Sequence, residues 1–162
     1  MMPKAPILLM APLVLFAHSL MPVPAKLQPG VGRLRIDQNF AFVQLTGYRE
    51  PRLEAAAARL VEDVARKTGI PMRPGVGLHA PSAALIVYCD HAGTAVQSAQ
   101  EDESYRLTVT AVGARLDAPN PLGVLRGMAT FLQLVDLDSS GFGVPAVTIE
   151  DHPRFPWRGL ML

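Results

Sequence analysis

The spacing of apolar residues changes along the chain, and each change marks a predicted element. Between residues 34 and 45, apolar side chains recur at every second position with one phase break near Asn39, which predicts two short strands or one bulged strand. From residue 52 to 68 the spacing becomes three or four residues, which predicts an amphipathic helix. Gly69 ends this helix, because glycine favours the position after a helix C-terminus.

The second half of the chain repeats this succession of strands and a helix. An uninterrupted apolar run over residues 83–88 predicts a central strand that is covered on both faces of a sheet. The remaining patterns predict strands at 105–111, 114–117 and 146–149, a helix at 120–135, and loops at 71–81, 91–100 and 141–145. This order favours an α+β fold with a mostly antiparallel sheet and two helices packed on one face.

The first 25 residues have the pattern of a secretory signal peptide. Lys4 supplies a positive charge, residues 7–16 are almost wholly apolar, and small residues at 23–25 have the usual cleavage spacing. A transmembrane anchor is the alternative, but prolines interrupt the apolar run, which is shorter than the roughly 20 residues that span a bilayer. We therefore expect export to the periplasm or the cell exterior, no membrane association after cleavage, and a folded domain at 26–152.

The composition indicates one globular domain without a strong electrostatic field. Of the 162 residues, 49% are hydrophobic and 18% are charged, which is enough to build a core. The formal net charge of +1 predicts no nucleic-acid partner. The single cysteine, Cys89, excludes an internal disulfide, and its apolar neighbours favour a buried strand thiol over a reactive one.

The acidic residues predict no glycosidase-type catalytic pair. Asp102 and Glu103 are adjacent before a predicted strand, where neighbouring side chains point to opposite faces. Enzymes that cleave glycosidic bonds usually need two carboxyl groups that face one sugar, or one carboxylic acid plus a group that orients the substrate's own acetamide. We therefore interpret this pair as part of a solvated turn in which one acid accepts a hydrogen bond.

Other candidate chemistry is also absent from the pattern, so we expect no catalytic, cofactor-binding or metal-binding residues. Ser104 lacks a nucleophile-elbow context, and Cys89 has no placed base. Residues 123–127 lack the Lys-Ser/Thr of a phosphate loop, so Arg126 is interpreted as a member of a surface or interdomain ion pair. The histidines are scattered without metal-ligand spacing, at His18, His79, His91 and His152.

Residues 151–162 differ in kind, because prolines, arginines and large aromatics precede the beginning of an apolar strand. A terminal apolar strand leaves backbone groups unpaired, so we expect further chain to follow. We interpret residues 153–162 as a linker and the first strand of another domain, with Phe155 and Trp157 fixing the contact. Direct contact of a sugar with Trp157 or Arg158 is the alternative.

Three segments resemble the N-terminal accessory domain of bacterial β-N-acetylhexosaminidases of glycoside hydrolase family twenty. They are Asp-Glu-Ser-Tyr-Arg-Leu at 102–107, Gly-Val-Leu-Arg-Gly-Met-Ala-Thr-Phe-Leu-Gln-Leu at 123–134, and Ile-Glu-Asp-His-Pro-Arg-Phe-Pro-Trp-Arg-Gly-Leu-Met-Leu at 149–162. The resemblance implies a zincin-like α+β domain packed against a TIM barrel. Ala129 departs from the glutamate that is frequent in the family, which bears on helix packing or the domain contact.

The resemblance also implies an activity that this chain alone lacks. Enzymes of the family release terminal N-acetylglucosamine or N-acetylgalactosamine with retention, using the substrate's 2-acetamido oxygen as nucleophile, an aspartate that orients it and a glutamate as acid and base. The sugar-binding arginine and both acids would follow Leu162, and Arg158 does not inherit the arginine's role. The implied partner is thus the barrel of the same polypeptide, which alone would reach the glycan, and no cofactor is implied.

A stand-alone secreted domain is the alternative function. In that interpretation Phe155 and Trp157 are exposed contact residues for carbohydrate or for a partner protein, and the chain has no enzymatic activity. Both interpretations treat the apolar residues near the C-terminus as part of a contact surface.

Overall fold

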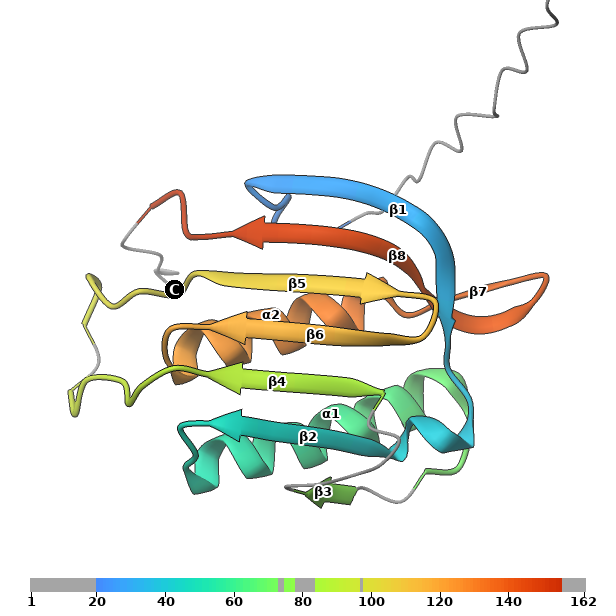
Figure 1. Cartoon of the computed structure of the whole chain (residues 1–162), viewed down its shortest axis with the longest axis horizontal. Coiled ribbons are helices and arrows are strands. Elements are labelled where there is room, and N and C mark those ends of the chain that lie inside the picture. The colour runs from blue at the N-terminus through green and yellow to red at the C-terminus, as the bar shows by residue number, and fades with distance from the viewer. Residues whose placement is uncertain (1–19, 73–74, 78–83, 97, 156–162) are drawn as a thin grey trace, which may run out of the picture.

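The computed structural model describes residues 20–72, 75–77, 84–96 and 98–155, which form one sheet with two helices behind it (Figure 1). The helices are α1 (Pro51–Thr68) and α2 (Pro121–Leu134), and η1 (Gln38–Ala41) is a short 3-10 helix. The strands are β1 (Lys26–Arg35), β2 (Phe42–Gly47), β3 (Gly75–Gly77), β4 (Leu85–Cys89), β5 (Tyr105–Thr110), β6 (Gly113–Ala118), β7 (Asp136–Asp138) and β8 (Gly141–Asp151).

The sheet has an antiparallel half and a parallel half. Its strand order is β1-β8-β5-β6-β4-β2-β3, and β7 adds to β8. The pairs β1–β8, β8–β5, β5–β6 and β7–β8 are antiparallel, whereas β6–β4, β4–β2 and β2–β3 are parallel. The predicted α+β class with a mostly antiparallel sheet is confirmed. The parallel half was not predicted. The connection through α1 returns the chain so that β3 and β4 are parallel to β2, and β6 is parallel to β4 because the antiparallel strand β5 comes between them in the chain.

Both helices begin and end where the sequence indicates. In α1, a proline occupies the first turn, and Gly69 adopts a left-handed φ of 71° while its N–H donates to the carbonyl of Ala65. In α2, the side-chain oxygen of Asn120 accepts hydrogen bonds from the N–H groups of Leu122 and Gly123, at 2.9 and 3.3 Å. Both helices lie on the same face of the sheet, as predicted (Figure 1).

The core lies between this sheet face and the helices. At its centre the rings of Phe40 and Phe131 stack with centroids 5.5 Å apart, and both side chains are buried. The prediction that the strand at 83–88 is covered on both faces is wrong. Burial alternates along β4, because the helices cover one face while Ile86 and Tyr88 are only half-buried.

Several segments predicted as loops or left unassigned are strands. β3 lies inside the predicted loop at 71–81, β7 has no apolar pattern, and β1 begins well before residue 34. The predicted turn at 141–145 belongs to β8. There, a Cβ atom on Gly143 would lie 2.7 Å from the carbonyl oxygen of Leu34, so this glycine permits close approach of β1 rather than a turn.

Residues 20–25, which we assigned to the signal peptide, contact the folded domain. Leu20 is 4% exposed and belongs to the core. The N–H of Met21 donates to Gln133 Oε1 at 2.9 Å, and Gln133 Nε2 donates to the carbonyl of Met21 at 3.1 Å. The N-terminal segment is thereby held against α2. Its predicted cleavage stays a prediction.

Candidate functional site

The three segments that carried the resemblance meet at one end of the sheet. β5 begins there at Tyr105, which is paired in register with Asp151 at the end of β8. One face of α2 lies beside them, and residues 151–155 lead away from the same place (Figure 1). We call the surface formed by residues 102–106, the exposed residues of α2 from 126 to 133, and residues 150–155 the exit surface.

A buried tyrosine links four parts of the chain at the exit surface. The hydroxyl of Tyr105 lies 2.6 Å from Thr130 Oγ1 and donates to Asp151 Oδ2 at 3.2 Å. Because the tyrosine hydroxyl has only one proton, which it donates to Asp151, Thr130 is the donor to the tyrosine oxygen. The other oxygen, Asp151 Oδ1, accepts from the N–H of Ala25 at 2.9 Å. This network joins α2, β5, the end of β8 and the N-terminal segment.

Burial is the main influence on the pKa of the Tyr105 hydroxyl. It raises the pKa of Tyr105 to about 12, because the ionised phenolate is poorly solvated among these neighbours and lies beside Asp151. The hydroxyl therefore stays protonated at neutral pH and acts as a structural donor. Removing a proton from a substrate at that pH requires a base with a far lower pKa.

The two acids that precede β5 have separate partners. Asp102 Oδ1 accepts from the N–H of Ser104 at 2.8 Å, and the backbone carbonyl of Asp102 accepts from Asn120 Nδ2 at 2.6 Å. Glu103 Oε2 pairs with Arg126 Nε at 2.6 Å. The predicted turn with a hydrogen-bonded acid and the predicted surface ion pair of Arg126 are both confirmed.

Two glycines of α2 let this helix lie unusually close to the sheet. A Cβ atom on Gly123 would be 2.2 Å from the carbonyl oxygen of Ser104, and one on Gly127 would be 2.2 Å from Leu116 Cδ1. Any larger residue forces the helix or its neighbours to move. The sequence analysis excluded a phosphate loop here but missed this packing role, for which the four-residue spacing on one helix face was a signal.

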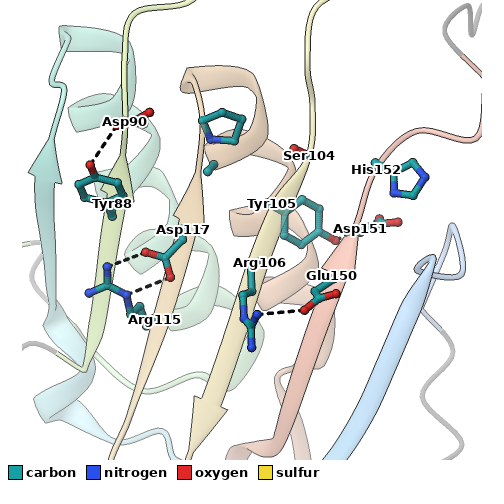
Figure 2. Close-up of a pocket in the computed structure, with 12 residues that line it drawn as sticks. Tyr88, Asp90, Ser104, Tyr105, Arg106, Arg115, Asp117, Glu150, Asp151 and His152 are labelled. Atoms are coloured by element: carbon teal, nitrogen blue, oxygen red, sulfur yellow. Dashed lines mark hydrogen bonds and ion pairs between the residues drawn. The ribbon is translucent and has the colours of Figure 1, made fainter.

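A shallow pocket of about 660 Å³ opens on the sheet face away from the helices (Figure 2). Its charges are paired within the domain. Arg115 holds Asp117 through contacts of 2.6 and 2.9 Å, and Arg106 contacts Glu150 at 3.0 Å. The hydroxyl of Tyr88 donates to Asp90 at 3.1 Å. The two arginine–carboxylate contacts are surface ion pairs, which water screens and which therefore contribute little to stability.

Glu150 illustrates why the pocket is unsuited to acid catalysis. A hydrogen bond and the charge of Lys26, followed by the charge of Arg106, hold the pKa of Glu150 below its usual range. The carboxylate is therefore ionised at neutral pH and has no proton to donate to a leaving group. A glycosidase acid needs the opposite shift.

A second cavity of about 590 Å³ lies between the N-terminal segment, α2 and the C-terminal segment. We call it the apolar groove. Its rim includes Met21, Val23 and Phe155, which are 74%, 63% and 70% exposed. Ala129, the departure noted in the sequence, also lines it. Exposed large apolar side chains gathered at one cavity are typical of a surface that binds another protein surface.

Cys89 is not among the residues that line either cavity. Its side chain is 1% exposed, and burial raises the pKa of the thiol to about 11. The predicted buried strand thiol is confirmed. A thiol with so high a pKa is almost wholly protonated at neutral pH and is a poor nucleophile.

The remaining candidates give no assembled site in the described part of the chain. His91 and His152 are exposed, whereas His18, His79, Trp157 and Arg158 lie outside the described residues. Among the residues that the structure describes, no three His, Cys, Asp or Glu side chains are grouped to hold a metal ion. No helix in these same ranges combines the length and apolar character that a membrane crossing requires.

Proteins of known family share both sequence and fold with this chain. The family model described as glycosyl hydrolase family 20, domain 2, matches residues 17–152. A beta-hexosaminidase of Akkermansia muciniphila is 48% identical over 63 residues, which cover 38% of this chain and 13% of that protein. The beta-hexosaminidase subunit beta of Felis catus is 38% identical over 93 residues, covering 57% of this chain and 18% of that protein. The chain thus corresponds to a small part of these relatives.

Solved structures agree with this assignment. The chitobiase of Flavobacterium johnsoniae superimposes with a TM-score of 0.79 and 35% identity, over 88% of this chain and 22% of that one. The family 20 β-N-acetylhexosaminidase of Streptomyces coelicolor shares the fold, with a TM-score of 0.63 and 22% identity over 83% of this chain and 26% of that one. Because the family model matches most of the sequence, this chain belongs to glycosyl hydrolase family 20 and carries domain 2 of that family.

Proposed function

We propose that this chain is the non-catalytic N-terminal domain of an exported β-N-acetylhexosaminidase, which hydrolyses terminal N-acetylhexosamine residues with a catalytic TIM barrel of the same polypeptide. The observation that carries the proposal is the exit surface, where three segments distant in sequence meet and from which residues 151–155 lead away. The beta-hexosaminidase names of the relatives support the substrate class.

The exit surface has the two components of an interdomain contact. The apolar groove, which the exit surface forms together with the N-terminal segment, exposes Met21, Val23 and Phe155 to solvent. Burying a large apolar side chain yields about 1.5–3 kcal/mol, so a partner that covers the groove is stabilised there. The neighbouring pocket contributes paired charges and two tyrosines, which suit a polar rim.

The proposed reaction places the chemistry in the barrel. The 2-acetamido oxygen of the substrate attacks the anomeric carbon, a barrel aspartate orients the acetamide, and a barrel glutamate protonates the leaving group and then activates water. The family resemblance supports this route. The acids of the exit surface are engaged instead, Glu103 by Arg126 and Glu150 by Lys26 and Arg106. The domain's role is to hold the barrel in place.

A stand-alone binding domain is the second candidate, and the apolar groove is the observation that favours it. The groove is lined by residues 151–155, so the chain that continues from Phe155 starts beside it. A segment attached at the rim has a high effective concentration there and covers the groove before a separate partner does. This position favours the interdomain interpretation.

The test compares this 162-residue chain with the polypeptide translated in frame past Leu162 from the same gene. We expect the longer polypeptide to hydrolyse an aryl N-acetylglucosaminide and the 162-residue chain to release no aryl alcohol above the uncatalysed rate. Hydrolysis by the 162-residue chain would contradict the non-catalytic role. A longer polypeptide without activity, together with saturable glycan binding by the chain, would favour the second candidate.

The contact itself is tested in the longer polypeptide with Phe155→Ser and, as a matched control, Val112→Ser. Val112 is 93% exposed at the β5–β6 turn, at the opposite end of β5 from the exit surface. We expect Phe155→Ser to lower the melting temperature and to speed proteolytic separation of the domain from the rest, with Val112→Ser close to wild type. Equal behaviour of the two variants would exclude the groove as the contact.

A further inference from the structure

The segment that precedes β1 is an integral part of the domain. Leu20 is buried in the core at 4% exposure, and Pro24 is buried as well. Met21 exchanges two hydrogen bonds with the Gln133 side chain, of 2.9 and 3.1 Å. The N–H of Ala25 donates to Asp151, which is part of the Tyr105 network. A single extended segment thus contributes to the core, to α2 and to the exit surface.

Cleavage at the small residues 23–25 would remove all of these contacts. The core would lose Leu20 and the Gln133 side chain would lose both partners from the backbone of Met21. The apolar groove would also lose Met21 and Val23 from its rim. A signal peptide is removed while the chain is still unfolded, so the folded contacts give no protection, but the mature domain would fold with a gap in its core.

A second pair of small residues lies upstream at the required spacing. Ala17 and Ser19 flank His18 directly after the apolar run that ends at Phe16, so they occupy the third and first positions before the Ser19–Leu20 bond. The family model begins to match at residue 17, which places residues 20–25 inside the stretch that this family shares. The buried segment and the family match both argue that residues 20–25 stay in the mature domain, and Ala17 and Ser19 supply the small residues for cleavage directly before them.

We propose that signal peptidase hydrolyses the Ser19–Leu20 bond and that Leu20 is the first residue of the mature protein. This inference rests on the proposed export. Water adds across the peptide bond: hydroxyl goes to the Ser19 carbonyl carbon, hydrogen goes to the Leu20 nitrogen, and the new amine takes up a proton at neutral pH. Residues 20–25 then remain and close the domain against α2.

The test is to express the chain from Met1 in a bacterium with a general export pathway and to determine the N-terminus of the exported protein by intact mass and N-terminal sequencing. We expect Leu20. An exported protein that begins at Lys26 or at Met1 would overturn the processing site while leaving export standing. A protein retained in the cytoplasm with Met1 in place would overturn export and the processing site together.

Two substitutions sharpen the test. Ser19→Tyr places a bulky residue directly before the proposed bond, and we expect it to slow precursor conversion at least ~10-fold in a pulse-chase measurement. Ala25→Tyr is the matched control, because Ala25 is exposed and contributes only its backbone N–H to Asp151. We expect its conversion to stay within about twofold of wild type. The reverse pattern would place the cleavage after Ala25 and overturn the proposal.

Discussion

The helix-covered core and the exit surface are held together by different forces. In the core, large apolar side chains such as Phe131 and Leu116 are fully buried. They belong to a helix and a strand that the spacing of apolar residues predicts. At the exit surface, single polar groups such as Thr130 and Asp151 connect segments that lie far apart in sequence. The comparison teaches that packing sets how stable this domain is, whereas a few hydrogen bonds set the shape of the surface it offers. Substitutions in the core should therefore lower the free energy of unfolding more than substitutions at the exit surface, which should mainly change the local structure there.

The largest effect is expected from Phe131→Ala. The ring is fully buried and stacks on Phe40, so its removal leaves a cavity between the helices and the sheet. We expect the free energy of unfolding, measured by urea denaturation, to fall by about 3–5 kcal/mol. A loss below about 1 kcal/mol would show that the core collapses around the gap.

Alkaline pH should destabilise the core through Cys89. Its pKa rises from 9 to about 11 on folding because the buried thiolate is poorly solvated. The unfolded state therefore loses this proton first, and stability that is complete below pH 9 falls as the pH rises to 11, by up to about 2–3 kcal/mol. Urea titrations at several pH values check this. Cys89→Ala should flatten the decline over that window, and an unchanged slope would assign the decline to other groups.

The close approach of α2 to the sheet is tested by Gly123→Ala. The added Cβ would meet the carbonyl oxygen of Ser104, which belongs to the backbone and cannot rotate away. We expect a loss of about 1–3 kcal/mol despite alanine's better helix propensity. Ala129→Ser, at an exposed position of the same helix, is the control and should stay within about 0.5 kcal/mol of wild type in the same denaturation assay. A stabilised Gly123→Ala variant would refute the steric role.

A smaller effect is expected from Tyr105→Phe. The substitution keeps the ring but removes the hydroxyl that contacts Thr130 and Asp151. We expect a loss of about 1–2 kcal/mol, since the remaining partners keep partial access to water. Amide hydrogen exchange should show faster opening at the start of β1, because Ala25 shares the Asp151 carboxylate. An unchanged exchange rate at these residues would show that the N-terminal segment does not depend on the Tyr105 network.

The smallest effect is expected from Arg126→Gln. This change removes the exposed ion pair with Glu103 and should cost no more than about 0.5–1 kcal/mol, with less effect at high salt. Thermal denaturation at two salt concentrations checks both points. A loss larger than that of Tyr105→Phe would mean that the exit surface depends on its charges more than on its buried network.

The sequence predicted the elements that have a periodic apolar pattern and missed the contacts that single residues make. Both helices and most strands follow from the spacing of apolar residues, because several residues contribute to each pattern. The Tyr105 network joins residues that are 25 and 46 positions apart, and a lone tyrosine, threonine or aspartate carries no period. The resemblance marked the segments around Tyr105 and Asp151 as important without showing that they touch. Gly143 was misinterpreted as a turn residue, because a glycine that permits close pairing of strands looks the same in sequence.

The antiparallel pairing of β1 with β8 dictates the order in which the domain can fold. Lys26 pairs with Glu150, so the first strand finds its neighbour only when nearly the whole domain has been synthesised. Contacts between distant parts of a chain raise contact order, which slows folding because the intervening loop must close first. The first strand therefore stays unpaired while the chain emerges. For the export proposed above, this delay would leave the first strand unpaired until the chain has crossed the membrane.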